Sequence, residues 1–136
     1  MKTVLFGNIY TDYWKLSLDD ISVKEDVIAL NGELNVGFFR AMTPMCISSG
    51  ILERFAADLQ RLNEKLEGSA VLESKNISSE VCLTLTCNHV GHIKASGSYS
   101  IKGNTLNFSF QTDQTQLAPL LRMVNSSLSK FRNALD

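Results

Sequence analysis

The sequence predicts an α+β protein of two layers, in which an antiparallel sheet of about six strands has two amphipathic helices packed on one face. Apolar and polar residues alternate along several segments, as they do in strands with one buried face. Two other segments carry apolar residues at spacings of three and four, as in helices with one buried stripe. A one-sided sheet must cover its apolar face, and these helices are the available cover.

The first predicted strands form a hairpin. Trp14, Leu16 and Leu18 alternate with polar residues, and a second alternation runs from Asp26 to Phe38. Gly32 falls on the buried side of this second strand. A glycine at such a position indicates a bend, a bulge or the close approach of a helix.

A loop and then a helix are expected next. The segment from Arg40 to Ser49 contains Pro44 and has no clean period, which is typical of a loop. Ser49 is the expected N-cap of the helix, and Gly68 can end it in the left-handed conformation. The apolar stripe of this helix consists of Ile51, Phe55, Leu59, Leu62 and Leu66.

Four more strands complete the predicted sheet as a meander. Each shows the same alternation, and Lys102, Gly103 and Asn104 provide the residues of a tight hairpin turn. The predicted strands are Ala70 to Lys75, Glu80 to Asn88, Val90 or Gly91 to Ile101, and Thr105 to Thr112.

The last segment is predicted to be helical. Asp113 with Gln116 three residues later has the form of a capping box. With that start Pro119 would break one backbone bond in the second turn, and a start nearer Thr115 or Ala118 would avoid this. The stripe of this helix consists of Leu117, Leu121, Val124, Leu128, Phe131 and Leu135.

Size and composition are those of a globular domain without a basic surface. A chain of 136 residues fits one domain, residues 1–136, and 44% hydrophobic with 20% charged residues is ordinary for such a domain. The formal charge of -1 removes the basic excess that drives binding to a phosphate backbone. We therefore expect no nucleic-acid partner.

The sequence also predicts a cytoplasmic protein with no membrane partner. The N-terminal segment MKTVLFGNIYTDYWKL lacks the apolar stretch and cleavage pattern of a signal peptide. No apolar run approaches the ~20 residues that span a bilayer. The three cysteines Cys46, Cys82 and Cys87 are an odd number, which fits a reducing compartment better than a disulfide framework.

The stretch from Cys87 to Gly97, CNHVGHIKASG, gathers a thiol and both histidines of the chain. With Cys82, the order C-x4-C-x-H-x2-H matches no common structural-zinc spacing, and Cys82 and Cys87 point to opposite faces of a strand. Cys87 is expected on the dry face, where a thiol is inert. His89 is then a turn-tip residue and His92 a solvent-facing strand residue, so we expect no metal, no cofactor and no catalytic residue.

Two surfaces are candidates for binding a protein partner. Over the first 36 residues, six acidic residues face three lysines, which indicates either a solvated hairpin or a patch that steers a basic partner. The candidate residues there are Asp19, Asp20, Glu25 and Asp26. A second candidate surface consists of Phe39, Met42 and Met45 in the predicted loop. We expect Phe38 and part of this apolar set to lie under the helix, and any exposed remainder to form an adaptable contact.

The order of landmarks resembles a family of small bacterial proteins that includes WapI-type immunity proteins. The resemblance rests on FFRAM, FAADLQRLNEKLEG, SAVLES, LTLTCNHVGHIKASGSYSI and LNFSFQTDQTQL, and it covers the chain from about Asp26 to Leu128. Its most specific parts are Gly91-His92-Ile93 and Asp113-Gln114-Thr115.

The resemblance implies an immunity protein of a polymorphic-toxin or contact-dependent growth inhibition system, which binds a cognate toxin domain in the cytoplasm and neutralises it by occlusion. It implies no enzymatic activity. Two alternatives stay open at this point. One is an enzyme with an unrecognised site near Cys87, His89 and His92, and the other is a small-ligand-binding module that uses the space between sheet and helices.

Overall fold

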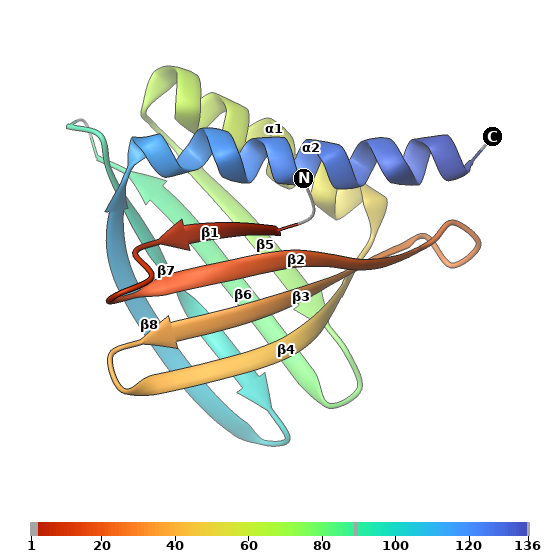
Figure 1. The fold of residues 1–136 in the computed structure, drawn as a ribbon, viewed down its shortest axis with the longest axis horizontal. Helices are drawn as coiled ribbons and strands as arrows, with labels where there is room; N and C mark the ends of the chain where they lie inside the picture. Colours follow the sequence, from red (N-terminus) through yellow and green to blue (C-terminus); the bar gives the residue numbers. More distant parts are fainter. Residues whose placement is uncertain (1–2, 89, 136) are drawn as a thin grey trace.

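The computed structural model describes residues 3–88 and 90–135, which form eight strands, two α-helices and one 3-10 turn (Figure 1). The strands are β1 Thr3–Gly7, β2 Tyr13–Ser22, β3 Val27–Val36, β4 Phe39–Ile47, β5 Ser69–Lys75, β6 Ser79–Cys87, β7 His92–Ile101 and β8 Asn104–Asp113. The helices are α1 Ser49–Lys65 and α2 Leu117–Ala134, and the 3-10 turn is η1 Gln114–Gln116.

The strands form two antiparallel sheets of four, in the orders β1-β2-β3-β4 and β5-β6-β7-β8. The two sheets cross, with the β1 to β4 sheet in front in Figure 1, and their apolar faces meet in one core. Helix α1 packs along β5, and α2 packs against β1 and β2. The α+β class is confirmed, but the expected single sheet of about six strands is wrong, because each sheet covers the apolar face of the other and the helices close one side.

Two of the eight strands were not predicted. The segment from Arg40 to Ser49, expected to be a loop, lies mostly in β4, and β1 at the N-terminus was not expected. Pro44 is tolerated because β4 is an edge strand. The Ser74 hydroxyl accepts from the Cys46 N–H at 3.1 Å, and the Asn76 amide donates to the Pro44 carbonyl at 2.9 Å. Side chains at the end of β5 and in the turn after it therefore provide partners for two backbone groups on this edge.

Helix α1 begins and ends one or two residues before the predicted positions. Ser48, not Ser49, is the N-cap, and its side chain accepts from the Ile51 N–H. Leu66 takes the left-handed conformation at the C-cap, with φ of 53°, and its N–H donates to the Leu62 carbonyl at 2.9 Å. Gly68 also has a positive φ but lies beyond the helix end.

The predicted capping box before α2 is confirmed for Asp113 but is wrong for Gln116. Asp113 accepts from the Thr115 N–H at 2.9 Å, as a cap does, but the Gln116 side chain accepts from the Gly7 N–H at 3.3 Å instead. Because η1 intervenes and α2 begins at Leu117, Pro119 lies in the first turn, where its missing N–H costs no hydrogen bond. The predicted stripe is mostly buried, except that Leu121 is partly buried and Leu135 is 59% exposed.

The close approach predicted at Gly32 is present, but side chains rather than a helix make it. The buried Trp14 Nε1 donates to Tyr99 Oη at 2.7 Å, which joins the two sheets across the core. A Cβ on Gly32 would lie 2.8 Å from Tyr99 Oη and 2.8 Å from Met45 Sδ. Phe38, expected in the core, is fully exposed because it lies with Gly37 in the two-residue turn between β3 and β4.

Candidate binding surfaces

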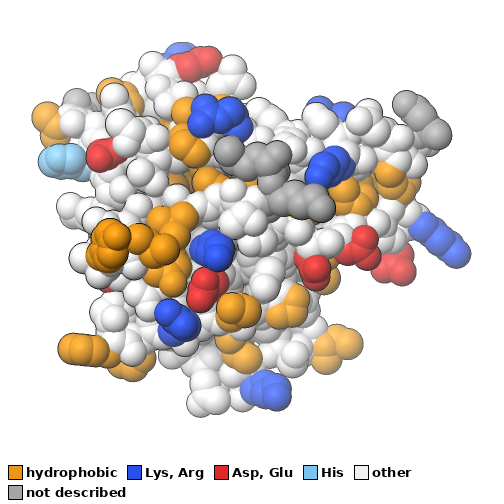
Figure 2. All heavy atoms as spheres, in the orientation of Figure 1, with side chains coloured by type: hydrophobic (Ala, Val, Ile, Leu, Met, Phe, Trp, Pro, Cys, Tyr) orange, Lys and Arg blue, Asp and Glu red, His pale blue; other side chains and the backbone are white. Residues whose placement is uncertain are grey.

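The hairpin of β2 and β3 extends beyond the body of the molecule, at the right in Figure 1. Its outer part, residues 19–26, is called the acidic arm here. A bulge interrupts the pairing between Leu18 and Asp20, so Asp19 has no partner in the ladder. Bulges increase the local twist of a strand and redirect its side chains. Figure 2 shows acidic side chains gathered over this part of the hairpin.

The acidic arm carries four carboxylates and one lysine, a formal charge of -3. Asp19, Asp20 and Glu25 are exposed, and no salt bridge among the described residues includes them. Asp20 accepts only from the neighbouring Ile21 N–H at 2.8 Å. These three carboxylates are thus placed in solvent at the end of a projecting hairpin, where little of the protein would have to move for a partner to reach them.

Asp26 has a structural task. It takes the left-handed conformation, with φ of 53°, and its carboxylate accepts from the Ser49 hydroxyl at 2.6 Å and from the Ser49 N–H at 3.3 Å. A carboxylate beside the first N–H groups of a helix is favoured by the helix dipole. Asp26 therefore ties the acidic arm to the start of α1.

The second predicted surface divides on β4. Phe39 is 63% exposed and Met42 is 56% exposed, whereas Met45 is fully buried in the core. Alternation separates the two methionines, because Met45 points between the sheets while Met42 points outward beside Glu33. Phe39 is on the same side of the strand as Met45 but is exposed because it is the first residue of β4, at the hairpin tip. Met45 is not accessible to a partner. Beside Phe39 a cavity of about 300 Å³ is lined by Ala41, Tyr99, Ile101 and Leu106 among others.

The stretch from Cys87 to Gly97 contains the turn between β6 and β7 and the first residues of β7, and Asn88 holds the turn together. The Asn88 side chain accepts from the Val90 and His92 N–H groups, each at 3.0 Å, and the Asn88 backbone N–H donates to the His92 carbonyl at 3.0 Å. Gly91 has φ of +84°, which suits glycine at this turn. The predicted turn-tip residue His89 lies outside the described residues. His92 is exposed at the start of β7, as expected.

The pKa values of the two thiols on β6 are raised. Cys87 is half-buried rather than fully inside, its Sγ donates to the Asn88 carbonyl at 3.1 Å, and burial raises its pKa. Burial, together with Glu73 and Glu80, also raises the pKa of Cys82. A raised pKa disfavours the thiolate, the form that attacks electrophiles and binds metals. Among residues 3–88 and 90–135, no three potential metal ligands come together.

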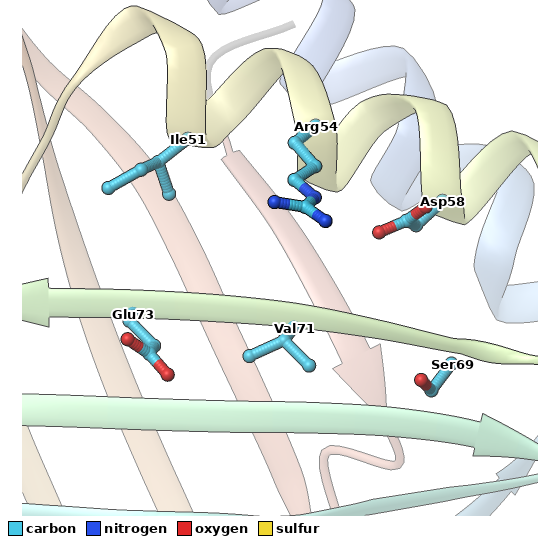
Figure 3. Close-up of a pocket in the computed structure, with 6 residues that line it drawn as sticks. All are labelled: Ile51, Arg54, Asp58, Ser69, Val71 and Glu73. Atoms are coloured by element: carbon cyan, nitrogen blue, oxygen red, sulfur yellow. The ribbon is translucent and has the colours of Figure 1, made fainter.

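A groove between α1 and β5 is the space nearest to the predicted ligand site between sheet and helices. Its volume is about 380 Å³, and Figure 3 shows Arg54 and Asp58 on the helix across from Ser69 and Val71 on the outer side of the strand. Ile51 and Glu73 complete the lining. The walls thus mix charges of both signs with a few apolar groups, without the apolar enclosure that small-molecule sites usually have.

The outer face of the second sheet is polar, as its alternation predicted. Thr84, Lys94 and Ser96 all lie on it, in neighbouring cross-strand positions of β6 and β7.

No described helix is long and apolar enough to cross a membrane.

Sequence reasoning missed the exposure of Phe38, because a run of two phenylalanines after a strand has the same pattern whether it enters the core or forms a hairpin tip.

Comparisons with solved structures support the fold alone. A chain from the crystal structures of Trypanosoma brucei MRP1/MRP2 superimposes with a TM-score of 0.58 at 11% identity, covering 98% of this chain and 86% of that chain. WHY1 from Arabidopsis thaliana superimposes with a TM-score of 0.51 at 11% identity, covering 98% and 88%. No curated protein matches the sequence.

A comparison with protein families gives a match over nearly the whole chain. Residues 8–132 match the model described as the immunity protein WapI-like family. The match begins within the loop that follows β1, so it includes β2 and the whole acidic arm, whereas the resemblance seen from the sequence began only at about Asp26. It ends near the C-terminus of α2.

Proposed function

The chain belongs to the WapI-like immunity protein family, and from this premise we propose that it neutralises a cognate toxin by binding the toxin domain directly and blocking its action. The observation that carries the proposal is the family match over residues 8–132. The family implies a role in toxin immunity that is not enzymatic. The raised pKa values of Cys82 and Cys87 are consistent with that role, because they make a thiol nucleophile on β6 unfavourable.

The acidic arm is the first proposed contact with the toxin. Exposed, like-charged groups on a projecting hairpin create a field that accelerates encounter with a basic surface, and those that become desolvated slow dissociation. Asp19, Asp20 and Glu25 are the residues we assign to this electrostatic role. Asp26 contributes charge but is engaged with Ser49, so we assign it to positioning the arm.

Phe39 and Met42 are the second proposed contact, since both are exposed on β4, on opposite faces of this edge strand. Met45 is left out of the surface because it is buried. We place the action in the cytoplasm of the toxin-producing cell, in a polymorphic-toxin or contact-dependent growth inhibition system, because an immunity protein must meet the toxin where the toxin acts.

Co-expression in a bacterium tests the proposed function. The toxin domain to use is the C-terminal domain encoded by the gene next to the one for this chain, expressed from an inducible promoter. The chain is expected to restore growth, and the two proteins should purify together when only one is tagged. Arrested growth in the presence of the soluble, folded chain, with every neighbouring toxin domain tried, would refute the proposal.

A further inference from the structure

Three of the four sheet edges are covered or blunted. Helix α2 packs against β1, and α1 packs along β5. At β4, Pro44 has no N–H to offer, and Ser74 and Asn76 occupy backbone groups of Cys46 and Pro44. Such devices prevent an edge strand from pairing with another chain. Of the four edges, only the outer side of β8 remains to be considered.

The fourth edge, the outer side of β8, is unprotected. This strand has ten residues and pairs only with β7, in a continuous register without a bulge. Residues 104–112 include no charged residue and no proline. In Figure 1, β8 runs along the left side of the molecule, where the β1–β2 and β3–β4 turns reach the same margin, and no described strand other than β7 pairs with it. A regular ten-residue edge, of which the first nine residues are uncharged, offers unpaired N–H and C=O groups over roughly 30 Å.

This edge is complementary to itself. In an antiparallel pair of two β8 strands related by a two-fold axis, alternate residues keep their faces. Leu106, Phe108 and Phe110 would therefore meet apolar residues of the second copy on the inner face. Asn107 and Ser109 would meet uncharged polar residues on the outer face, so no like charges are opposed along residues 104–112.

We propose that two copies of this chain associate through β8, which would join their second sheets into one continuous sheet of eight strands. An independent feature favours a partner here. The exposed Phe38 and Phe39 belong to the hairpin tip next to this strand, and Phe39 shares a cavity of about 300 Å³ with Leu106. A second copy paired at β8 would bring apolar residues toward this uncovered area.

The geometry keeps this association separate from the acidic arm, the first proposed toxin contact, whereas Phe39 of the second proposed contact lies beside β8. The acidic arm extends at the opposite end of the molecule from β8 in Figure 1, so both arms of a β8-paired dimer stay exposed. The inference does not depend on the proposed function, because it rests on the edge alone.

Sedimentation velocity over a range of protein concentrations tests the dimer. The parent is expected to show a reversible monomer–dimer equilibrium. A variant with Asn107→Lys and Ser109→Lys, and one with Asn107→Glu and Ser109→Glu, should both be monomeric, because like charges then meet across the two-fold axis in any nearby register. An equimolar mixture of the two variants should form the dimer again. That recovery would not occur if the substitutions merely damaged the fold.

The opposite edge of the same sheet provides a matched control. Ser69→Lys with Val71→Lys places two lysines at exposed positions of β5, where dimerisation should be unaffected. A parent that stays monomeric at the highest concentration would overturn the proposal, as would a dimer that persists in the lysine variant of β8. If the parent is monomeric and this lysine variant loses toxin binding, the edge accepts a strand of the toxin rather than a second copy, which also overturns it.

Discussion

At the residue scale, glycines show what an alternation pattern leaves out. The pattern placed Gly97 on the apolar side of β7, and its neighbours Ala95 and Tyr99 are indeed buried. It did not show why that position holds a glycine. In the structure, a Cβ at Gly97 would overlap the carbonyl oxygen of Cys82 on the adjacent strand. The last residue of CNHVGHIKASG is therefore required by strand packing, not by chemistry at the histidines.

Substitution of Gly97 by alanine is predicted to lower the free energy of unfolding by about 1 to 3 kcal/mol, because backbone must shift to admit the methyl group. Urea denaturation followed by tryptophan fluorescence measures this through the buried Trp14. The control is Gly50→Ala in α1, where no atom lies within 4 Å of the new Cβ. The control should be neutral or more stable by up to about 1 kcal/mol. Equal stabilities for the two variants would contradict the crowding.

Contacts between residues far apart in the sequence could not be predicted either, because a local pattern gives the face on which a residue lies but not its neighbours on other elements. Both Trp14 and Tyr99 were placed on apolar faces by their period, but nothing local indicates that their side chains hydrogen-bond across the core. The role of Asp26 is similar. Its charge was visible in the sequence, whereas its bonds to Ser49 depend on how the β2–β3 hairpin meets α1.

At the element scale, strong periodicity was a good guide and edge strands were not. Both helices and six strands were predicted close to their observed positions, since each buries one long face. The strand β4 was missed because Pro44 normally argues against a strand, yet an edge strand can accept it. The strand β1 is only five residues long, which gives too few repeats for a period to be recognised.

The last helix is predicted to be essential to the fold. Leu128→Ala removes a side chain that is 2% exposed and should lower the free energy of unfolding by about 2 to 5 kcal/mol. Leu135→Ala, one residue beyond the helix and 59% exposed, is the matched control and should have little effect. Thermal and urea denaturation would check both variants. A Leu128→Ala protein as stable as the Leu135→Ala protein would show that α2 does not cover the core.

The acidic arm is predicted to control the rate of toxin association. Asp19→Lys with Glu25→Lys reverses two exposed charges and should slow association about tenfold at low ionic strength, with a smaller effect at high salt. Surface plasmon resonance with the immobilised toxin domain measures the rate. Glu64→Lys with Glu67→Lys makes the same charge change near the other end of α1 and should leave the rate much nearer to that of the parent. Equal slowing in both variants would mean that only net charge matters.

At the scale of the whole molecule, the sequence predicted the class of the fold but not its arrangement. Eight one-sided strands have the same alternation whether they form one sheet covered by helices or two sheets that cover each other. Which apolar face meets which is decided by connections and by core volume, and neither is visible in a local pattern. The candidate surface shows the same limit, since exposure separated Phe39 and Met42 from Met45 only once the two sheets were in place.

Function at this scale depends on the family and on direct binding. Membership of the WapI-like immunity protein family gives the role in toxin immunity. Direct occlusion is the part of the account that is proposed, and it requires a complex between two purified proteins with no third component. The dimer proposed through β8 would change the size of this complex but not its ratio of one toxin domain per chain.

Isothermal titration calorimetry of the purified chain with the toxin domain of the neighbouring gene tests the central claim most directly. The account predicts saturable binding at one toxin domain per chain, with a dissociation constant below about 1 µM, which corresponds to roughly 8 kcal/mol. The toxin should lose its activity at the same molar ratio. A chain that protects cells but gives no binding to the folded toxin domain at concentrations of about 100 µM would contradict direct occlusion, because such protection would have to act elsewhere than on the toxin itself.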